Sequence, residues 1–208
     1  MKRVLLYLTI LTSGYIAAAE LQVKVSDAEG KPLPYTVIDL INPNYLALPT
    51  AAPAQVIQQD LNFQPFVSVI PKGTLVEFPN LDKTRHHVYS FSKAKTFELR
   101  LYVGKAEAPV LFDQTGIVTL GCNIHDNMLA HIYVSGSQFS AVTNAEGEAY
   151  FNDLPETDFQ LKLWHPWQEK ELAPIQITIM PGIQKRQVDT AIVQQALPKA
   201  PKKGFGDY

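Results

Sequence analysis

The chain has 208 residues, with 18 lysines and arginines against 20 aspartates and glutamates, so its formal net charge is −2 at pH 7. This overall balance does not favour nucleic acid as a partner. The length is sufficient for one large domain or for two small domains, each with its own hydrophobic core.

The first nineteen residues have the composition of a secretory signal peptide. Lys2 and Arg3 precede an apolar run over residues 4–16, and three alanines at residues 17–19 stand before Glu20. Small residues of this kind form a cleavage site, and the apolar run is short for a membrane span. Cleavage would leave 16 basic and 20 acidic residues, a charge near −4. We expect a periplasmic or otherwise exported protein without stable membrane insertion, and an uncleaved membrane anchor is the alternative.

The regular segments that follow have the alternating, β-branched and aromatic composition of strands. Turns rich in glycine and proline separate them at intervals of roughly 8–12 residues, which is typical of β-sandwiches. We expect no long helix. The expected strands include residues 21–25, 34–40, 66–70 and 74–78, and the expected turns include residues 27–30, 71–73, 144–147 and 180–182. The sequence therefore predicts an all-β protein.

Two stretches, residues 23–40 and 139–164, share an order of strand, polar turn ending in glycine, and strand. Together they predict one small sandwich that resembles the carboxypeptidase-regulatory or transthyretin-like type. Its two parts would be residues 20–52 and 138–193, interrupted by a domain at residues 55–137. The alternative is an N-terminal hairpin that belongs to the inserted domain. Residues 194–208 lack apolar periodicity, so we expect a disordered tail.

The interrupting segment contains Cys122, the only cysteine, so no internal disulfide can form in an oxidising compartment. In the order Cys122-x-x-His125-x-x-Met128, the chain offers a thiolate, an imidazole and a thioether. With a second histidine, these ligands make up a mononuclear blue-copper site with a weak axial methionine. His86 or His87, upstream of the cysteine, can supply that histidine. Alternatively, Cys122 is an inert buried thiol and Met128 only fills the core.

Other polar residues have simpler interpretations. His131 and His165 are expected to be packed or surface histidines, and Asp126 to cap its loop. The basic residues within 93–100 are interpreted as the solvated edge of a strand, protected by charge. No Ser-His-Asp order, phosphate-binding loop, dinucleotide turn or carboxylate pair stands out, so we do not expect an enzyme.

The region from residue 54 to residue 134 resembles the cupredoxins of the amicyanin and plastocyanin type. The resemblance is carried by the following motifs: Phe63-x-Pro65, Val69-x-x-x-Gly73-x-x-Val76-x-Phe78-x-Asn80, His86-His87-Val88, Gly116-x-Val118 and the loop from Cys122 to Met128. With its second sandwich ending in Leu163-Trp164-His165-Pro166, nearly all of the mature chain resembles the exported methylamine utilization proteins of plastocyanin type.

This resemblance implies a Greek-key cupredoxin sandwich that binds one type 1 copper through His86, Cys122, His125 and Met128. The first histidine ligand of the family is usually followed by Asn, whereas here His87 stands in that place. The His-x-Val pattern favours His86, and His87 remains the alternative. Asn80 would hydrogen-bond across the two ligand loops and hold the site rigid.

The resemblance also implies a function: transfer of single electrons between redox partner proteins, in methylamine or related oxidation. Partners would dock on an apolar rim around His125 formed by Ile124, Met128, Leu129 and Ala130. Copper enzymes place a histidine beside the type 1 cysteine to reach a second copper centre, whereas Gly121 and Asn123 flank Cys122 here. The alternative function is a module that binds copper for delivery, or an envelope scaffold without a redox role.

Overall fold

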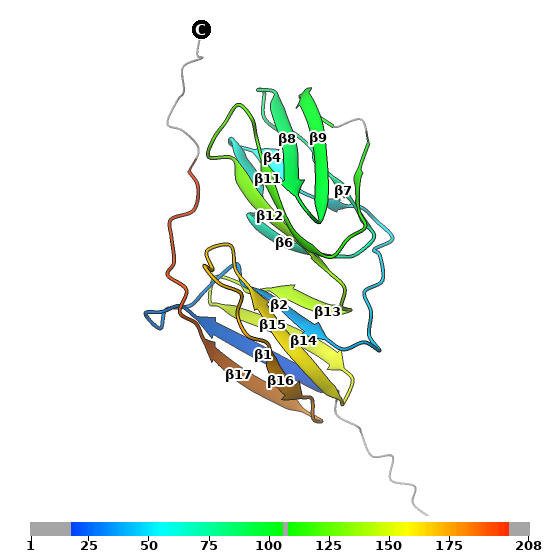
Figure 1. Ribbon diagram of the computed structural model, residues 1–208, viewed down its shortest axis with the longest axis vertical. Helices are drawn as coiled ribbons and strands as arrows, with labels where there is room; N and C mark the ends of the chain where they lie inside the picture. The colour runs from blue at the N-terminus through cyan, green and yellow to red at the C-terminus, as the bar shows by residue number, and fades with distance from the viewer. Residues whose placement is uncertain (1–17, 106–107, 200–208) are drawn as a thin grey trace, which may run out of the picture.

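The computed structural model describes residues 18–105 and 108–199, and every regular element in this part is a β-strand. The predicted all-β class is confirmed. Figure 1 shows two stacked lobes. We call residues 54–135 the central lobe, and residues 19–42 with 137–192, which hold the first and last strands, the terminal lobe. The boundaries of the predicted domains stay a prediction.

The signal-peptide prediction falls mainly on residues 1–17, which lie outside the described residues. In the described part of the chain, no helix is long and apolar enough to span a membrane. Residues 200–208, most of the predicted tail, also lie outside. Its first residue, Gln194, donates hydrogen bonds to the Asp27 carboxylate at 2.9 Å and the Pro32 carbonyl at 2.8 Å, and is thereby held against the terminal lobe.

The terminal lobe contains two sheets, ordered β14-β1-β17 and β13-β2-β15-β16. Their strands are β1 (Ala19–Ser26), β2 (Val37–Ile41), β13 (Phe139–Val142), β14 (Glu148–Leu154), β15 (Asp158–Trp164), β16 (Ile175–Thr178) and β17 (Ile183–Asp189). Alternate residues of β1, such as Leu21 and Val23, are buried against residues such as Ile38 and Leu161 of the other sheet. Strands β1 and β2 pair only with strands that follow residue 137.

Two polar turns of the terminal lobe are built alike. The Asp27 carboxylate accepts the amides of Glu29 and Lys31, both at 2.9 Å. The Asn144 side-chain oxygen likewise accepts the amides two and four residues ahead, at 3.0 and 2.8 Å. Gly147 ends the second turn at φ 71°, and a Cβ there would lie 2.5 Å from the Val25 carbonyl oxygen. Such local side-chain acceptors explain why the sequence pattern predicts both turns.

The central lobe is a mixed sandwich. A five-stranded sheet, β6-β12-β11-β8-β9, faces a three-stranded sheet, β10-β7-β3, and β4 with β5 forms a hairpin at one end. The strands are β3 (Ala54–Gln55), β4 (Ile57–Gln59), β5 (Asn62–Gln64), β6 (Val67–Pro71), β7 (Thr74–Glu77), β8 (His86–Ser92), β9 (Lys95–Tyr102), β10 (Val110–Phe112), β11 (Gly116–Gly121) and β12 (Leu129–Ser135). Phe78, Phe97 and Phe112 pack together in its core, with ring centroids 5.4–6.5 Å apart.

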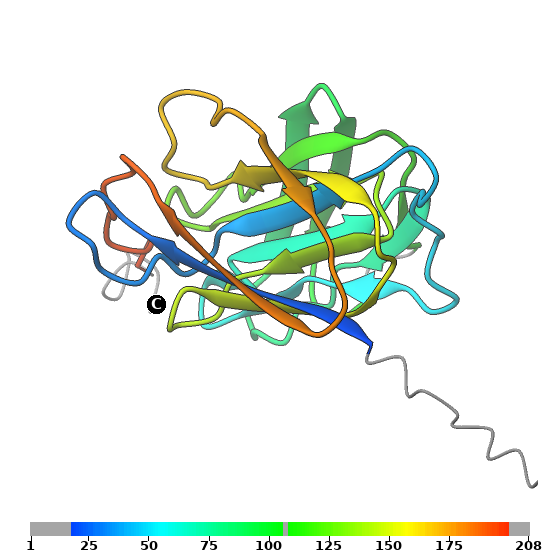
Figure 2. The same cartoon turned by 90° about the horizontal axis from the view of Figure 1, so that it is seen from below.

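Strand β12 faces both lobes because successive side chains of a strand point to opposite sides. Ala130, Ile132 and Val134 are buried in the central core, whereas Tyr133 packs against Val37 and Trp164 of the terminal lobe. At this interface the buried Asp39 carboxylate accepts hydrogen bonds from Ser135 at 2.8 Å and Tyr133 at 3.3 Å. Figure 2, seen from below, shows terminal-lobe strands lying across the central lobe. The two lobes therefore share a packed interface of aromatic and polar side chains.

Candidate metal centre

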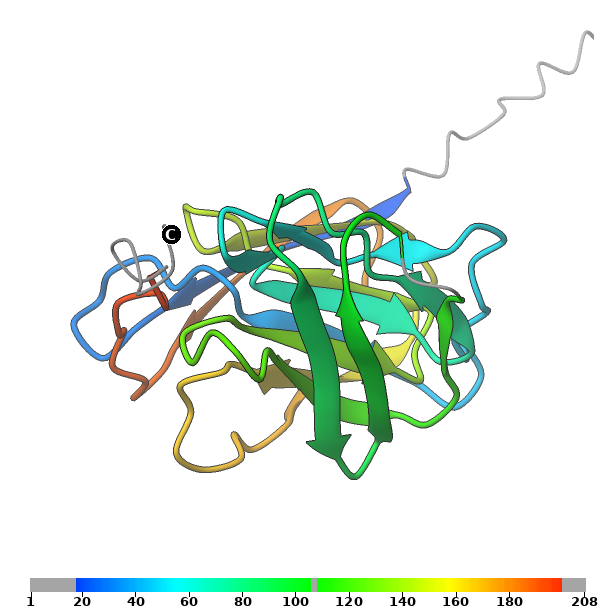
Figure 3. The same cartoon turned by 90° about the horizontal axis from the view of Figure 1, so that it is seen from above.

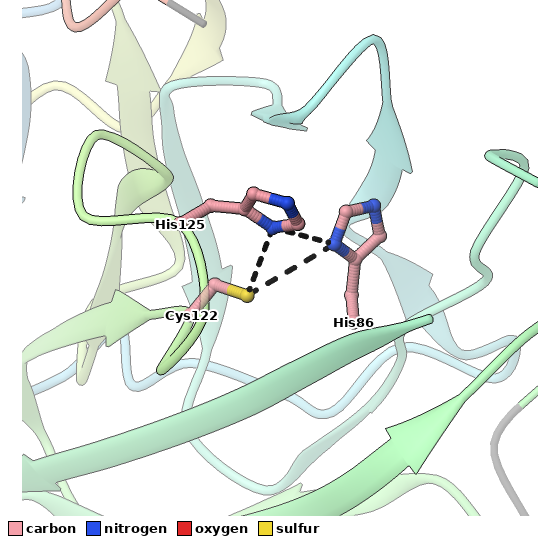
Figure 4. A group of neighbouring side chains, drawn as sticks. All are labelled: His86, Cys122 and His125. Carbon is pink, nitrogen blue, oxygen red and sulfur yellow. Dashed lines mark hydrogen bonds between the residues drawn. The ribbon is translucent and has the colours of Figure 1, made fainter. Parts of the chain in front are cut away.

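The candidate centre lies at one end of the central lobe, where two neighbouring strands place their ligands side by side. His86 is the first residue of β8, and Cys122 directly follows β11, which pairs with β8. His125 stands in the loop between β11 and β12. Figure 4 shows the three side chains pointing toward one another. Residues far apart in the sequence therefore meet because β8 and β11 are adjacent in the sheet.

The ligand atoms of these three residues form a compact triangle. The Cys122 Sγ lies 3.9 Å from Nδ1 of His86 and 3.6 Å from Nδ1 of His125, and the two nitrogens are 3.2 Å apart. A point equidistant from the corners of such a triangle lies about 2.1 Å from each, close to metal–nitrogen bonds of ~2.0–2.1 Å and metal–sulfur bonds of ~2.3 Å. The geometry therefore fits one metal ion without movement of the backbone.

Asp82 fixes the orientation of His86. Its Oδ2 lies 2.8 Å from Nε2 of His86, which is fully buried. Because the carboxylate accepts the Nε2 proton, Nδ1 keeps a free lone pair toward the triangle. Burial lowers the pKa of His86, but the Cys122 sulfur and the Asp82 carboxylate outweigh it and raise that pKa.

The position of Asp82 is fixed by a strained backbone turn. Its two carboxylate oxygens accept the amides of Asp60 at 2.8 Å and Leu61 at 3.0 Å. Both residues have positive φ, 54° and 57°, in the tight turn between β4 and β5. Side chains other than glycine rarely adopt this conformation. The turn therefore holds the carboxylate, and the carboxylate holds the imidazole.

Several donors favour the thiolate form of Cys122. Burial alone would raise the pKa of the thiol, but hydrogen bonds from His86, from the backbone amides of His87 and Ile124, and from His125 lower it to about 6. The thiolate is the form of cysteine that binds metal ions. The site is therefore ready to bind a soft or borderline cation near neutral pH.

Met128 and Asn80 complete the predicted set, in different ways. Met128 is buried in the same core cluster as Cys122, and its amide donates to the His125 carbonyl at 2.9 Å, which folds the loop back on itself. Asn80 donates to the carbonyls of Thr84 at 2.9 Å and Tyr102 at 2.7 Å. These bonds tie the loop before His86 to β9, whereas we expected Asn80 to bridge the two ligand loops.

The other histidines lie outside the triangle. His87 is half-buried, and its Nε2 lies 3.0 Å from a carboxylate oxygen of Glu98. His131 and His165 are buried at the interface between the lobes, as packed histidines are expected to be. Asp126 is exposed. The structure thus brings together His86, Cys122 and His125.

Two features of the site escaped the sequence analysis. One is Asp82, whose position four residues before His86 is a signal that could have been noticed. The other is the contact of Tyr89 with Gly121, which joins strands far apart in the sequence and leaves no local pattern. A Cβ at Gly121 would lie 2.8 Å from Cζ of Tyr89, so only glycine allows the ring to lie against this backbone.

The chain matches no family model and no curated protein sequence. Among solved structures, it is similar to a Cu-containing nitrite reductase (NirK) from Thermus scotoductus SA-01, with 24% identity and a TM-score of 0.38 over 43% of this chain and 25% of that chain. A purple cupredoxin from Nitrosopumilus maritimus gives 22% identity and a TM-score of 0.33 over 39% and 99% of the two chains. A reduced Cu(I) form of an amicyanin mutant gives 13% identity and a TM-score of 0.37 over 47% of this chain and 98% of that chain. Because these identities and TM-scores are low, the assignment of the metal centre depends on its own geometry.

Proposed function

We propose that the central lobe binds one copper ion as a type 1 centre and that the protein carries single electrons between redox partners. The observation that carries this proposal is the triangle of one cysteine sulfur and two imidazole nitrogens. One thiolate, two imidazoles and a weak thioether form the ligand set of blue-copper electron carriers. In this proposal Met128 is the axial ligand.

The surroundings of the triangle support fast electron transfer. Copper, when bound, would supply a one-electron couple between Cu(II) and Cu(I). The Asp82 carboxylate and the amides on Cys122 hold the ligands in one geometry, so the protein has little to rearrange when the charge changes. A small rearrangement favours a carrier over a catalyst that must bind and reshape a substrate.

The surroundings also argue for a carrier rather than an enzyme. Gly121 and Asn123 flank Cys122, so neither neighbour can reach a second copper with an imidazole. We further propose that the protein works after export, on the basis of its signal-like N-terminus. A role in methylamine or related oxidation rests on the sequence resemblance alone.

The test is the absorption spectrum of the purified protein after addition of Cu(II). We expect an intense visible band from thiolate-to-copper charge transfer, and we expect Cys122→Ser to lose it while keeping the fold. Asp126→Asn, an exposed change in the same loop, is the matched control and should keep the band. A colourless wild-type protein that takes up only Cu(I) would instead indicate copper delivery.

A further inference from the structure

Three aromatic rings form a ladder along the outer face of β8. His87, Tyr89 and Phe91 alternate with buried residues, so all three point away from the central core. Their ring centroids are 5.6 Å apart between His87 and Tyr89 and 5.1 Å apart between Tyr89 and Phe91. Such spacings give direct contact between rings. We call these three residues the aromatic ladder.

The aromatic ladder begins at the metal centre. The His87 amide donates to the Cys122 sulfur. Tyr89 pairs with Gly121 across β8 and β11, and its ring covers the glycine that is bonded directly to Cys122. The residue next to the proposed cysteine ligand therefore lies directly beneath an aromatic side chain of the outer face.

The other end of the aromatic ladder is open to solvent. Phe91 is 81% exposed. Farther across the same sheet, the outward residues His131 and Tyr133 of β12 are covered by the terminal lobe, through contacts with Trp164. Figure 3, seen from the end of the molecule opposite the terminal lobe, shows β8 and β9 in front. Within the part of the chain that the structure describes, β8 therefore extends with its exposed Phe91 beyond the interface that the terminal lobe uses.

Basic residues surround the aromatic ladder. Residues 83–100 contain five of the 18 lysines and arginines but one of the 20 acidic residues, in a chain of net charge −2. That acidic residue, Glu98, lies with a carboxylate oxygen 3.0 Å from Nε2 of His87. Within the described residues, the exposed Arg85, Lys93 and Arg100 form no ion pair. This positive region complements an acidic surface.

The rim around His125 that we expected to receive partners is smaller than the sequence suggested. Ile124 is 49% exposed, but Met128 and Ala130 are buried at 1% each. The hollow beside Leu129 is lined in part by Trp167 and by the chain just before residue 200, which belong to the other end of the sequence. The rim therefore offers little free apolar surface, because the loop folds inward.

We propose that the outer face of β8 and β9, centred on the aromatic ladder, is the docking surface for an acidic redox protein. The partner's acidic residues meet Arg85, Lys93 and Arg100, and electrons pass between the partner and Cys122 by way of Tyr89 and Gly121. The contact is small, below ~1,200 Å² in total, as suits transient redox encounters. This inference rests on the proposed electron-carrier function for its redox part only, since docking itself needs no metal.

Docking is tested by NMR on the metal-free protein, with the acidic haem protein cytochrome b5 as the probe. We expect the amide resonances of Tyr89, Phe91 and Arg100 to shift most, and the shifts to disappear at high salt as the charges are screened. Largest shifts around Ile124 and His125, or across the terminal lobe, would overturn the proposal. A failure of copper binding would leave this experiment unaffected, so it would count against the proposed function alone.

Electron transfer is tested by stopped-flow oxidation of the Cu(I) protein with hexacyanoferrate(III), which takes one electron and becomes hexacyanoferrate(II). The double variant Lys93→Glu/Arg100→Glu should react about ten-fold more slowly at low salt, a change within the range of electrostatic steering. Lys185→Glu/Arg186→Glu, with the same charge change on exposed residues of β17, is the matched control and should react much faster than Lys93→Glu/Arg100→Glu. Equal slowing by both pairs would mean that only net charge matters and would refute the proposed surface.

Discussion

The molecule places two pairs of histidines in opposite environments. At the metal centre, His86 and His125 turn their nitrogens toward a thiolate, and the pKa of His86 is raised by that sulfur and by Asp82. At the interface between the lobes, burial lowers the pKa of both His131 and His165 to about 4, so these imidazoles are neutral. Nearby anions therefore distinguish His86, a proposed ligand, from His165, a packing residue, although both are fully buried.

The partners of the interface histidines agree with this difference. His131 packs against Phe66 and Trp164, with ring centroids 5.5 Å apart in each case. His165 donates from Nε2 to the Pro34 carbonyl at 3.0 Å, and its Nδ1 accepts the Trp167 amide at 3.2 Å. Both nitrogens of His165 are thus used in a neutral ring. Within the described residues, neither histidine belongs to a cluster of metal-ligating side chains.

The largest expected effect separates the two adjacent histidines at the metal centre. Loss of a side chain that only supports a metal ligand lowers metal affinity by roughly 10–100-fold. His86→Ala removes a ligand atom itself, so it should lower copper affinity by more than this. His87→Ala should change affinity only slightly, since its ring faces Glu98 and Tyr89. Competition titration with a copper chelator measures both. The opposite ranking would assign the ligand role to His87.

The second prediction concerns acid stability and the interface histidines. Their folded pKa values lie below the unfolded value, so the neutral rings stabilise the fold fully above about pH 6.5, and this contribution falls as the pH drops toward 4. Each histidine can cost up to about 3 kcal/mol by then. Asp39 has the opposite effect on stability. Because burial raises its pKa in the folded state, its contribution to stability grows as the pH falls.

Urea unfolding between pH 7 and pH 4 tests this. His131→Phe should keep the aromatic packing and lose less stability over this range than the wild type. An equal loss in both proteins would show that His131 does not titrate on unfolding.

The third prediction concerns the carboxylate behind His86. Asp82→Asn keeps one of the two oxygen acceptors that hold the Asp60 and Leu61 amides and the His86 imidazole, and it removes the negative charge that favours the more highly charged Cu(II). We therefore expect a higher reduction potential and Cu(II) affinity weakened by about 10–100-fold. Asp113→Asn, which removes an exposed carboxylate paired with Lys95, is the control. If both variants shift the potential alike, the effect is one of overall charge.

The smallest expected effect is on the axial position. Met128→Gln replaces a thioether with a harder oxygen donor, which should lower the reduction potential, since axial ligation tunes blue-copper sites. Voltammetry of the copper-loaded variant measures this. A potential equal to that of the wild type would mean that Met128 only packs in the core.

How much the sequence could predict depended on how local each feature is. The loop from Cys122 to Met128 and the turns around Asp27 and Asn144 are set within a few residues, so the sequence pattern indicated them. The His-x-Val pattern favoured His86, which is fully buried, over His87. The position of Tyr89 over Gly121 could not be predicted, because it depends on the register between distant strands. The burial of Ala130 in the supposed rim likewise depends on tertiary packing.

The most direct test of the central claim is X-ray absorption at the copper edge of the loaded protein. If Cys122, His86 and His125 bind one copper, the spectrum contains one short copper–sulfur distance and two copper–nitrogen distances, and Cys122→Ser removes the sulfur contribution. A copper shell of nitrogen and oxygen alone in the wild type would contradict the account.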